Sequence, residues 1–377
     1  MAQKSTRRKF LTAAGASGAL ALAGCTGGND GQETTEGGGG AGTTEKDMQE
    51  TTGTKTESGS QSQSSGPLKG GGSSTVYPIA STAASVWSSN PPADDKEYWG
   101  PGQYGIDTSK ALADYWAGLY GFESGQGGDP PFRVSIGLSH SGTGLEKLKK
   151  GLLDMGNASA PVDAELPDAS QSELNKFKDH VVGVDAQPIV VSKEIYEAGV
   201  KKLTADQVRK IYTGKIKNWS EISSYSGEEK EIQAVGRAQG SGTDTAFRLN
   251  MLGSADAKMP GVDVRKGQNQ QVKTLVSKSN NAIAYMALAF VTGDVPAIKL
   301  EFDGKTYAPG KNLADENYPL SRDLHMYTYE GTSKKEAAFL RMVVSKFGQE
   351  NYVKTQGYAA LTKARRQEEL NKLPSTN

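Results

Sequence analysis

Cysteine is nearly absent from this chain of 377 residues, in which Cys25 is the only one. A single cysteine cannot form a disulfide within the chain, and it cannot supply the thiolate clusters that bind zinc. Cys25 also lies near the N-terminus, ahead of a tract of Gly, Thr and Glu, and such a position is unsuited to a folded core. Disulfides, cysteine-ligated metals and cysteine nucleophiles are therefore excluded from the folded part.

The chain also lacks an excess of charge of either sign, because it carries 43 basic and 43 acidic side chains. A nucleic-acid-binding protein should present a basic face, so this balance argues against that class. The three histidines lack the spacing of metal ligands and are read as surface or strand residues. Two catalytic signatures are missing too, the Gly-x-Ser-x-Gly nucleophile elbow and the phosphate loop of ATPases. We expect no metal and no cofactor.

No apolar run is long enough for a comfortable membrane span, since the stretch at 10–23 is short and rich in Gly and Ala. Residues 6–11 (Thr-Arg-Arg-Lys-Phe-Leu) resemble a twin-arginine export signal, and residues 22–25 (Leu-Ala-Gly-Cys) resemble a lipobox. We therefore predict a removable signal over residues 1–24 and a lipid on Cys25, which would anchor the protein to the outer face of the cell membrane. Removal of that signal leaves a net charge of −4.

Residues 25–69 are almost all Gly, Ser, Thr, Glu and Gln, with hardly any bulky apolar side chain. Such a segment cannot bury enough apolar surface to fold, so it predicts a flexible linker. The remainder, from residue 70 onward, is long enough for two lobes with substantial cores.

From residue 70 onward, short apolar strands alternate with amphipathic helices, which predicts an α/β fold with largely parallel strand pairing. Capping boxes at Thr204 with Gln207 and at Ser333 with Glu336 open two helices. We expect the second of these helices to continue to Gly348. The strands are predicted over residues 134–138, 181–184, 188–191, 232–236, 282–286 and 324–329.

The segment 86–131 is rich in Gly, Pro, Trp and Tyr around one plausible helix at 109–120. Its tryptophans are Trp87, Trp99 and Trp116, which we interpret as local packing anchors. A platform for an aromatic ligand remains the alternative, because nothing in their spacing decides between the two.

The run 237–243 (Arg-Ala-Gln-Gly-Ser-Gly-Thr), ahead of a helix-forming stretch at 244–251, has the composition of an oxyanion site. Small residues let the backbone approach a ligand, hydroxyls donate hydrogen bonds, and the first-turn N–H groups of a helix lie at its positive dipole end. Arg237 adds a charged planar fork that suits a tetrahedral anion. The same composition also suits an ordinary loop and N-cap, so this run alone does not distinguish an oxyanion site from a plain helix start.

Three other segments share this character. Residues 72–78 place Gly, Ser and Thr ahead of a helix with proline near its first turn. Residues 139–144 (Ser-His-Ser-Gly-Thr-Gly) open another helix, and residues 154–161 form a small-residue strand end and turn. Each could be a plain cap, but several such segments together with one well-placed arginine favour convergence on a single anion.

In this order, the segments resemble the phosphate-binding proteins of phosphate ABC importers, which are type II periplasmic-type solute-binding proteins. Residues 212–219 (Tyr-Thr-Gly-Lys-Ile-Lys-Asn-Trp) and 282–285 (Ala-Ile-Ala-Tyr) extend the resemblance, which runs from about Gly72 to the end of the chain. It implies an α/β fold of two lobes with a hinge, and phosphate enclosed in the cleft between them. Lobe 1 would comprise residues 70–182 and 318–377, and lobe 2 residues 183–317.

The resemblance also implies which residues bind phosphate, when the family's positions are carried over one by one. Backbone and hydroxyl donors would replace the hydration shell of the anion, and one guanidinium would balance its charge. The implied ligands are Ser74, Thr75, Ser141, Ser159, Arg237, Ser241, Gly242 and Thr243.

One departure from the family concerns Ser159. Some members carry an aspartate at this position, which accepts a hydrogen bond from a protonated phosphate oxygen and so rejects sulfate. A serine hydroxyl can donate or accept, so phosphate binding survives while the usual basis for rejecting sulfate is lost. Gln239 likewise replaces an acid beside the arginine. Other candidates for a nearby acceptor are Asp154, Asp163 and Asp244.

Taken together, the resemblance implies a monomeric receptor outside the cell that captures inorganic phosphate and delivers it to an ABC permease, without chemistry of its own. A receptor for sulfate, molybdate or a phosphonate is the alternative that Ser159 leaves open. A phosphoester hydrolase with Ser141 or Ser241 as nucleophile is a third reading, for which the sequence offers no base partner.

Overall fold

The structure is a computed structural model that describes residues 66–313 and 317–377. The predicted signal, Cys25 and most of the predicted linker lie outside these residues. Strand β1 (Leu68–Ser73) is already formed at Leu68, whose side chain is 2 % exposed, so the linker predicted to end at residue 69 was placed two residues too far. The last two residues of the predicted linker, Leu68 and Lys69, are therefore part of a sheet.

Close packing explains the glycines of β1. A Cβ on Gly70 would lie 2.8 Å from the Ile136 side chain, and one on Gly71 would lie 3.0 Å from the carbonyl of Gly137. Glycine in a strand often marks such a close approach of neighbouring backbone. The low apolar content of this strand therefore reflects crowding rather than an inability to fold.

One sheet contains five strands in the order β2-β1-β3-β12-β4. Strand β1 pairs in parallel with β2 and β3, whereas β12 runs antiparallel to β3 and β4. Its other strands are β2 (Val134–Ser139), β3 (Met155–Ala158), β4 (Phe177–Ala186) and β12 (Ser321–Tyr329).

A second sheet contains four strands in the order β5-β9-β7-β8, and a small third sheet has the order β11-β10-β6. Strand β7 pairs in parallel with β8 and β9, and β5 runs antiparallel to β9. Each sheet thus mixes both kinds of pairing, so the prediction of largely parallel sheets was only partly right. These strands are β5 (Ile189–Val191), β6 (Lys202–Thr204), β7 (Gln233–Arg237), β8 (Val264–Lys266), β9 (Ala282–Tyr285), β10 (Lys299–Phe302) and β11 (Lys305–Tyr307).

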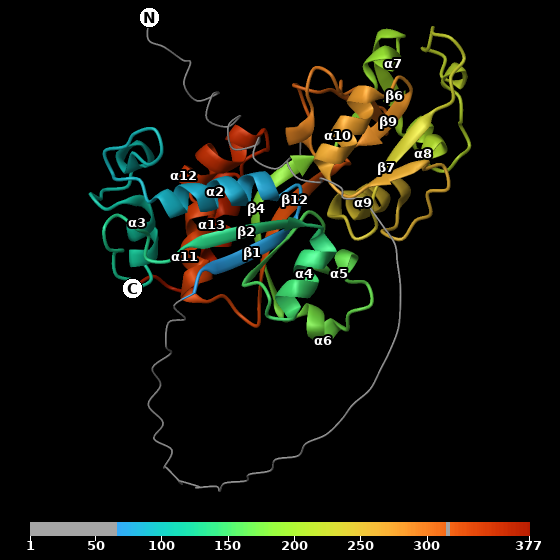
Figure 1. Cartoon of the computed structure of the whole chain (residues 1–377). Coiled ribbons are helices and arrows are strands. Elements are labelled where there is room, and N and C mark those ends of the chain that lie inside the picture. The colour runs from blue at the N-terminus through green and yellow to red at the C-terminus, as the bar shows by residue number, and fades with distance from the viewer. Residues whose placement is uncertain (1–65, 314–316) are drawn as a thin grey trace, which may run out of the picture. The chain divides into compact units, whose positions relative to one another are not determined.

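Helices lie against both faces of the five-stranded sheet (Figure 1). Helices α2, α3 and α11 contribute to the larger core, where Trp87, Trp99 and Trp116 are buried as the packing anchors that we predicted. Helix α4 packs on the opposite face. The helices are α2 (Tyr77–Ser89), α3 (Leu112–Gly118), α4 (Ser141–Lys149), α5 (Val162–Glu165), α6 (Gln171–Leu174), α7 (Lys193–Glu197), α8 (Ala205–Tyr212), α9 (Gly242–Phe247), α10 (Asn269–Lys278), α11 (Lys334–Val344), α12 (Lys346–Gly348) and α13 (Lys363–Asn371).

The two predicted capping boxes are present at the starts of α8 and α11. Helix α11 ends at Val344, however, and not at Gly348 as predicted. Ser345 leaves the helical conformation, with φ −57° and ψ 164°, and its hydroxyl accepts a hydrogen bond from the N–H of Gly348 to cap α12. A serine that can cap a new helix therefore interrupts an apolar pattern that reads as continuous.

The chain passes between the two larger sheets along two adjacent connections. One follows β4 and leads to β5, and the other leads back into β12. The N–H of Gln187 donates to the carbonyl of Leu320 at 2.9 Å, and the Tyr318 hydroxyl donates to the carbonyl of Gln187 at 2.8 Å.

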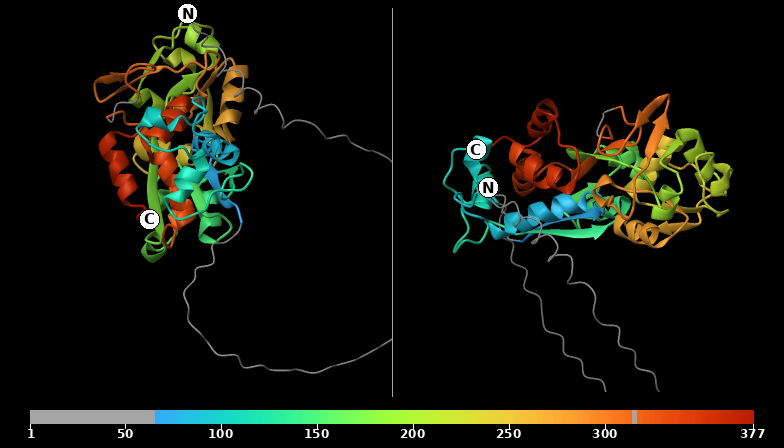
Figure 2. Two further views of the ribbon diagram at one scale, coloured as in Figure 1. Left: turned by 90° about the vertical axis from the view of Figure 1, so that its left-hand side faces the viewer. Right: turned by 90° about the horizontal axis from the view of Figure 1, so that it is seen from above.

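At the far end of the five-stranded sheet, the N–H of Asn377 bonds to the carbonyl of Leu119, so the C-terminus lies beside α3 (Figure 2).

None of the helices within residues 66–313 and 317–377 is both long enough and apolar enough to span a bilayer.

Candidate anion-binding site

The structure buries all eight predicted ligands and brings them together where strands of the two larger sheets end. The hydroxyls of Thr75 and Thr243 lie 3.1 Å apart, and the guanidinium of Arg237 donates to the Ser74 hydroxyl at 3.2 Å. The N–H of Gly242 donates to the Ser141 hydroxyl, also at 3.2 Å. Segments separated by up to 168 positions thus meet in one polar cluster. The side chains concerned are Ser74, Thr75, Ser141, Ser159, Arg237, Ser241 and Thr243, together with the backbone of Gly242.

Three helices begin at this cluster, and their N-cap residues provide no side-chain hydrogen bond to the first turn. They are α2 after Val76, α4 after His140 and α9 after Ser241. By contrast, α8, α11 and α13 each begin with a Ser or Thr hydroxyl that caps the helix. Uncapped first-turn N–H groups at the positive end of the helix dipole are suited to an external anion.

Arg237 ends β7 with a guanidinium that is surrounded by neutral oxygen atoms. Its side chain is 1 % exposed and donates to the carbonyls of Lys266 and Gly267 and to the side chains of Asn269 and Ser74. Burial lowers the pKa of the guanidinium to about 10, so it stays charged at neutral pH. None of these four partners carries a compensating negative charge, which suits a residue that is to bind an anion.

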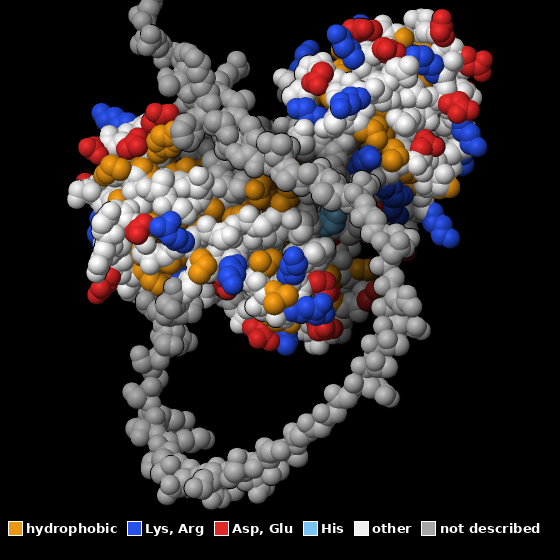
Figure 3. Space-filling view, viewed as in Figure 1, with side chains coloured by type: hydrophobic (Ala, Val, Ile, Leu, Met, Phe, Trp, Pro, Cys, Tyr) orange, Lys and Arg blue, Asp and Glu red, His pale blue; other side chains and the backbone are white. Residues whose placement is uncertain are grey.

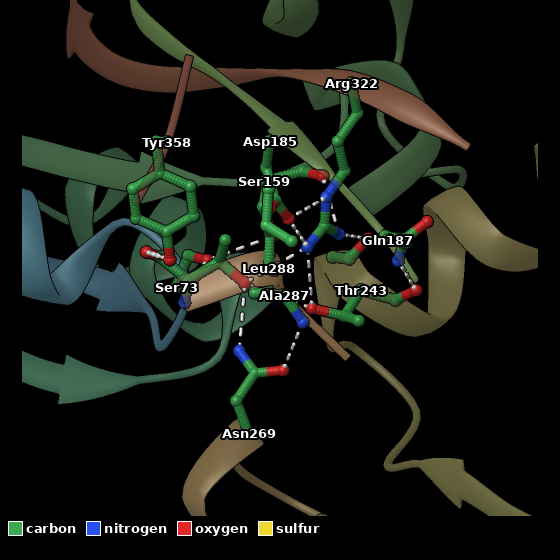
Figure 4. Close-up of polar contacts among 12 residues, drawn as sticks. Ser73, Ser159, Asp185, Gln187, Thr243, Asn269, Ala287, Leu288, Arg322 and Tyr358 are labelled. Atoms are coloured by element: carbon green, nitrogen blue, oxygen red, sulfur yellow. Dashed lines mark hydrogen bonds and ion pairs between the residues drawn. The ribbon is translucent and has the colours of Figure 1, made fainter. Parts of the chain in front are cut away.

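Arg322 is a second buried guanidinium that the sequence analysis missed. From β12 it donates to the hydroxyls of Thr75 and Thr243 at 3.2 and 3.1 Å (Figure 4). It also donates to the carboxylate of Asp185 on β4, at 2.7 and 3.0 Å. Burial raises the pKa of Asp185 and the adjacent Arg322 charge lowers it in part. The signal for Arg322 was available, because an arginine two residues before Leu324 occupies an inward position of the strand.

Asn269, the first residue of α10, is another participant that sequence reasoning missed. Its side-chain oxygen accepts from the guanidinium of Arg237 at 2.7 Å and from the N–H of Ala287 at 3.2 Å. Its amide nitrogen donates to the hydroxyls of Ser74 and Thr75. Asn269 therefore orients Arg237 and two predicted ligands together. Its sequence neighbourhood is ordinary, so only its spatial position identifies it.

Gly242 allows α9 to approach the opposite wall of the site. A Cβ at this position would lie 2.5 Å from the Ser141 hydroxyl and 2.6 Å from the Ser159 hydroxyl, closer than real side chains pack. We therefore expect Gly242→Ala to weaken phosphate binding at least about fivefold, because overpacking of this size costs about 1–3 kcal/mol. Isothermal calorimetry would measure the change. Gly293→Ala, whose Cβ would meet nothing within 4 Å, should bind as the wild type does, and equal losses in both variants would refute the argument.

The three aspartates proposed as nearby acceptors do not fill that role. Asp154 accepts from the N–H of Lys69 at 2.6 Å, and Asp163 is exposed. Asp244 is buried, but its carboxylate is bonded to Arg248 and Arg265 and to the hydroxyl of Tyr285. The acidic side chain that does border the site is Glu165, at the end of α5.

The carboxyl of Glu165 is buried, and neither of its oxygens makes a hydrogen bond with a described residue. Burial raises its pKa to about 8, although the nearby Thr245 hydroxyl, the Arg322 charge and the Gly142 N–H each offset part of the rise. None of the described carboxylates, histidines or cysteines forms a cluster of three or more that could hold a metal ion. The histidines His180 and His325 lie on β4 and β12, where they bond to Thr332 and Asp179.

The raised pKa of Glu165 predicts a pH-dependent stability. A carboxyl whose pKa is higher in the folded state than in the unfolded state stabilises the fold below about pH 4.5, and this contribution is lost as the pH rises toward about 8. Between about pH 5 and pH 9 the free energy of unfolding should therefore fall by up to about 4 kcal/mol more in the wild type than in Glu165→Gln. Urea unfolding at a series of pH values would measure it. Parallel pH profiles for the two proteins would contradict the assignment.

The surface offers no comparable concentration of one charge on the face shown in Figure 3, where acidic and basic side chains are interspersed among the described residues. This pattern agrees with the balanced composition of the chain.

Comparison with known proteins places these observations in a family. Residues 124–346 match the model of the PBP superfamily domain. The chain is 30 % identical over 234 residues to the phosphate-binding protein PstS of Bacillus subtilis, an alignment that covers 62 % of this chain and 73 % of that protein. A substrate-binding protein of Clostridium perfringens solved with bound phosphate has a similar fold, with a TM-score of 0.57 and 22 % identity over 78 % of this chain and 100 % of that one.

An ABC-type phosphate transport receptor from Vibrio cholerae is also similar in fold, with a TM-score of 0.52 and 22 % identity, over 78 % of this chain and 100 % of the receptor. The mixed α/β architecture with several sheets agrees with the predicted two-lobed fold. The chain therefore belongs to the PBP superfamily, in the family of the phosphate-binding protein PstS.

Proposed function

We propose that this protein is an extracytoplasmic receptor that binds inorganic phosphate between two lobes and delivers it to an ABC permease, without catalysing a reaction. The observation that carries the proposal is the convergence of three uncapped helix starts with Arg237 and Arg322 in one buried cluster. Backbone N–H groups, hydroxyls and guanidiniums are the donors that can replace the water around a tetrahedral anion. The names of the relatives, which include phosphate-binding protein PstS, agree with this ligand.

The lobes that we propose comprise residues 70–182 with 318–377, and 183–317. Strand β4 continues to Ala186, four residues past the first of these boundaries, and the next residue, Gln187, donates to the carbonyl of Thr243 within the second lobe. The adjacent connections around Gln187 and Leu320 would form the hinge. Direct contacts across the cleft, such as Thr75 with Thr243, would separate when the lobes open and admit phosphate.

The cellular location that we propose rests on the sequence of the N-terminal residues. The signal of residues 1–24 and the lipid on Cys25 would place the receptor at the outer face of the membrane, beside its permease. We further propose that the receptor acts as a monomer.

Two other functions remain as alternatives. A receptor for sulfate, molybdate or a phosphonate would use the same donors, and the serine at position 159 favours it. A phosphoester hydrolase has less support, because the hydroxyl of Ser141 accepts from two backbone N–H groups, and no described histidine or carboxylate bonds to it. Hydrolysis of p-nitrophenyl phosphate would test this reading.

Titration of phosphate into the protein by calorimetry would test the proposed function. A shortened chain should begin before Leu68, because a start at residue 70 would remove part of β1. We expect saturable binding of one phosphate per chain, with weaker binding of sulfate and molybdate at about pH 9. If another oxyanion binds more tightly than phosphate, that oxyanion is the ligand and the phosphate assignment is wrong. Hydrolysis of p-nitrophenyl phosphate by the protein would overturn the non-enzymatic role.

A further inference from the structure

Three side-chain oxygens converge beside Gly242, and one of them belongs to Glu165. A Cβ placed on Gly242 would lie 2.5 Å from the Ser141 hydroxyl, 2.6 Å from the Ser159 hydroxyl and 2.9 Å from Oε1 of Glu165. The carboxyl therefore forms part of the same wall as two proposed phosphate ligands. It also lies beside α4, because a Cβ on Gly142 would be 3.6 Å from its other oxygen.

The hydroxyl and N–H groups of this wall hydrogen-bond to one another and not to the carboxyl. The hydroxyl of Ser141 accepts from the N–H groups of Gly242 and Ser159, and the hydroxyl of Ser159 accepts from that of Ser73. Neither oxygen of Glu165 takes part in these bonds. A buried carboxylate repels a bound anion unless a proton lies between them.

We propose that Glu165 is a specificity-determining residue of this site, which shares one proton with the bound oxyanion. This inference rests on the proposed function of the site as an oxyanion receptor. Phosphate still carries a proton at pH 9 and can donate it to an ionised Glu165, whereas sulfate has none to donate at neutral or alkaline pH. Sulfate binding therefore requires a protonated Glu165, and phosphate binding does not.

The charged and titratable groups around Glu165 come from three elements. Arg322 on β12 favours the ionised form of the carboxyl, and Asp244 on α9 disfavours it. Tyr327 on β12 stays neutral because burial raises its pKa, and Asp163 lies on the same helix α5. Burial outweighs the favourable contacts and raises the pKa of Glu165 to about 8, so the carboxyl changes charge within a range that is open to binding experiments.

Calorimetric titration of sulfate and of phosphate at about pH 7 and pH 9 tests the inference. Sulfate affinity of the wild type should fall about tenfold between these values, because the fraction of Glu165 that is protonated falls by that factor. Phosphate affinity should not fall over this range, because an ionised Glu165 can accept the proton that phosphate still carries. Glu165→Gln cannot ionise, so its sulfate affinity should be the same at both pH values.

Glu336→Gln is the matched control. Burial also raises the pKa of Glu336, to about 7, but this carboxyl caps α11, and its variant should keep the tenfold fall for sulfate. A second readout needs no variant. Titrations at pH 9 in two buffers of different ionisation heat should show uptake of nearly one proton with each sulfate, and less with phosphate.

The outcomes separate this inference from the proposed function. If phosphate binds but sulfate affinity is equal at both pH values, or sulfate fails to bind at pH 7, the role of Glu165 is overturned and the receptor function stands. The role is also overturned if Glu165→Gln keeps the tenfold fall. If neither anion binds at either pH, the receptor function is wrong, and the inference falls with it.

Discussion

Replacement of Arg237 by alanine is expected to reduce the affinity for phosphate at least 100-fold. The guanidinium is 1 % exposed, stays charged, and makes its hydrogen bonds to neutral atoms only, so its charge is available to the anion. Loss of one partner of a buried, charge-assisted contact costs about 2–5 kcal/mol, and a 100-fold change corresponds to about 2.7 kcal/mol. Calorimetry on the folded variant would measure it.

Arg133→Ala is the control for this experiment. It also removes one positive charge, but Arg133 is exposed and pairs only with Asp129 at the surface, at 2.8 Å. We expect its phosphate affinity to equal that of the wild type. If Arg237→Ala also binds phosphate with unchanged affinity, the site has been placed wrongly.

Replacement of Asp185 by asparagine should have the largest effect on stability. This carboxylate is fully buried and bonds to the guanidinium of Arg322 through two nitrogens. Removal of its charge leaves Arg322 buried without a counter-charge, and such changes cost about 3–5 kcal/mol. The midpoint of urea unfolding should therefore fall sharply, and phosphate binding should change as well because Arg322 contacts Thr75 and Thr243.

The adjacent Asp323 provides the comparison for Asp185. Its carboxylate bonds to Arg365 at 2.7 Å, but both side chains are about one-third exposed. Exposed ion pairs contribute about 0–1 kcal/mol, so Asp323→Asn should unfold close to the wild-type midpoint. If both variants lose a similar amount of stability, the buried ion pair of Asp185 and Arg322 does not stabilise the fold more than the exposed pair does.

The segments that meet at the candidate site could be recognised along the chain. Each predicted ligand belongs to a short segment of small residues and hydroxyls, and all of these segments except 154–161 also contain a recognisable helix start. The six strands read from apolar runs are also present, within wider bounds for several of them. Strands, helix starts and loops that depend on residues close together in the sequence could therefore be predicted before the fold was known.

Features that depend on distant contacts were not accessible in the same way. Arg322 reaches Thr75 across 247 positions, and Asn269 reaches Ser74 across 195. Glu165 ends a short helix, and its burial comes from α4 and α9 rather than from its own segment. Strand β1 was missed for the same reason, because its glycines are required by the strands and helix that pack against it.

A crystal structure of the protein grown with phosphate would test the central claim most directly. We predict one phosphate enclosed between the two lobes, within hydrogen-bond distance of Arg237, the hydroxyls of Thr75 and Ser141 and the N–H groups that begin α9. The contacts of Thr75 with Thr243 should lengthen to admit it. Phosphate bound elsewhere, with these residues still bonded only to one another, would contradict the account.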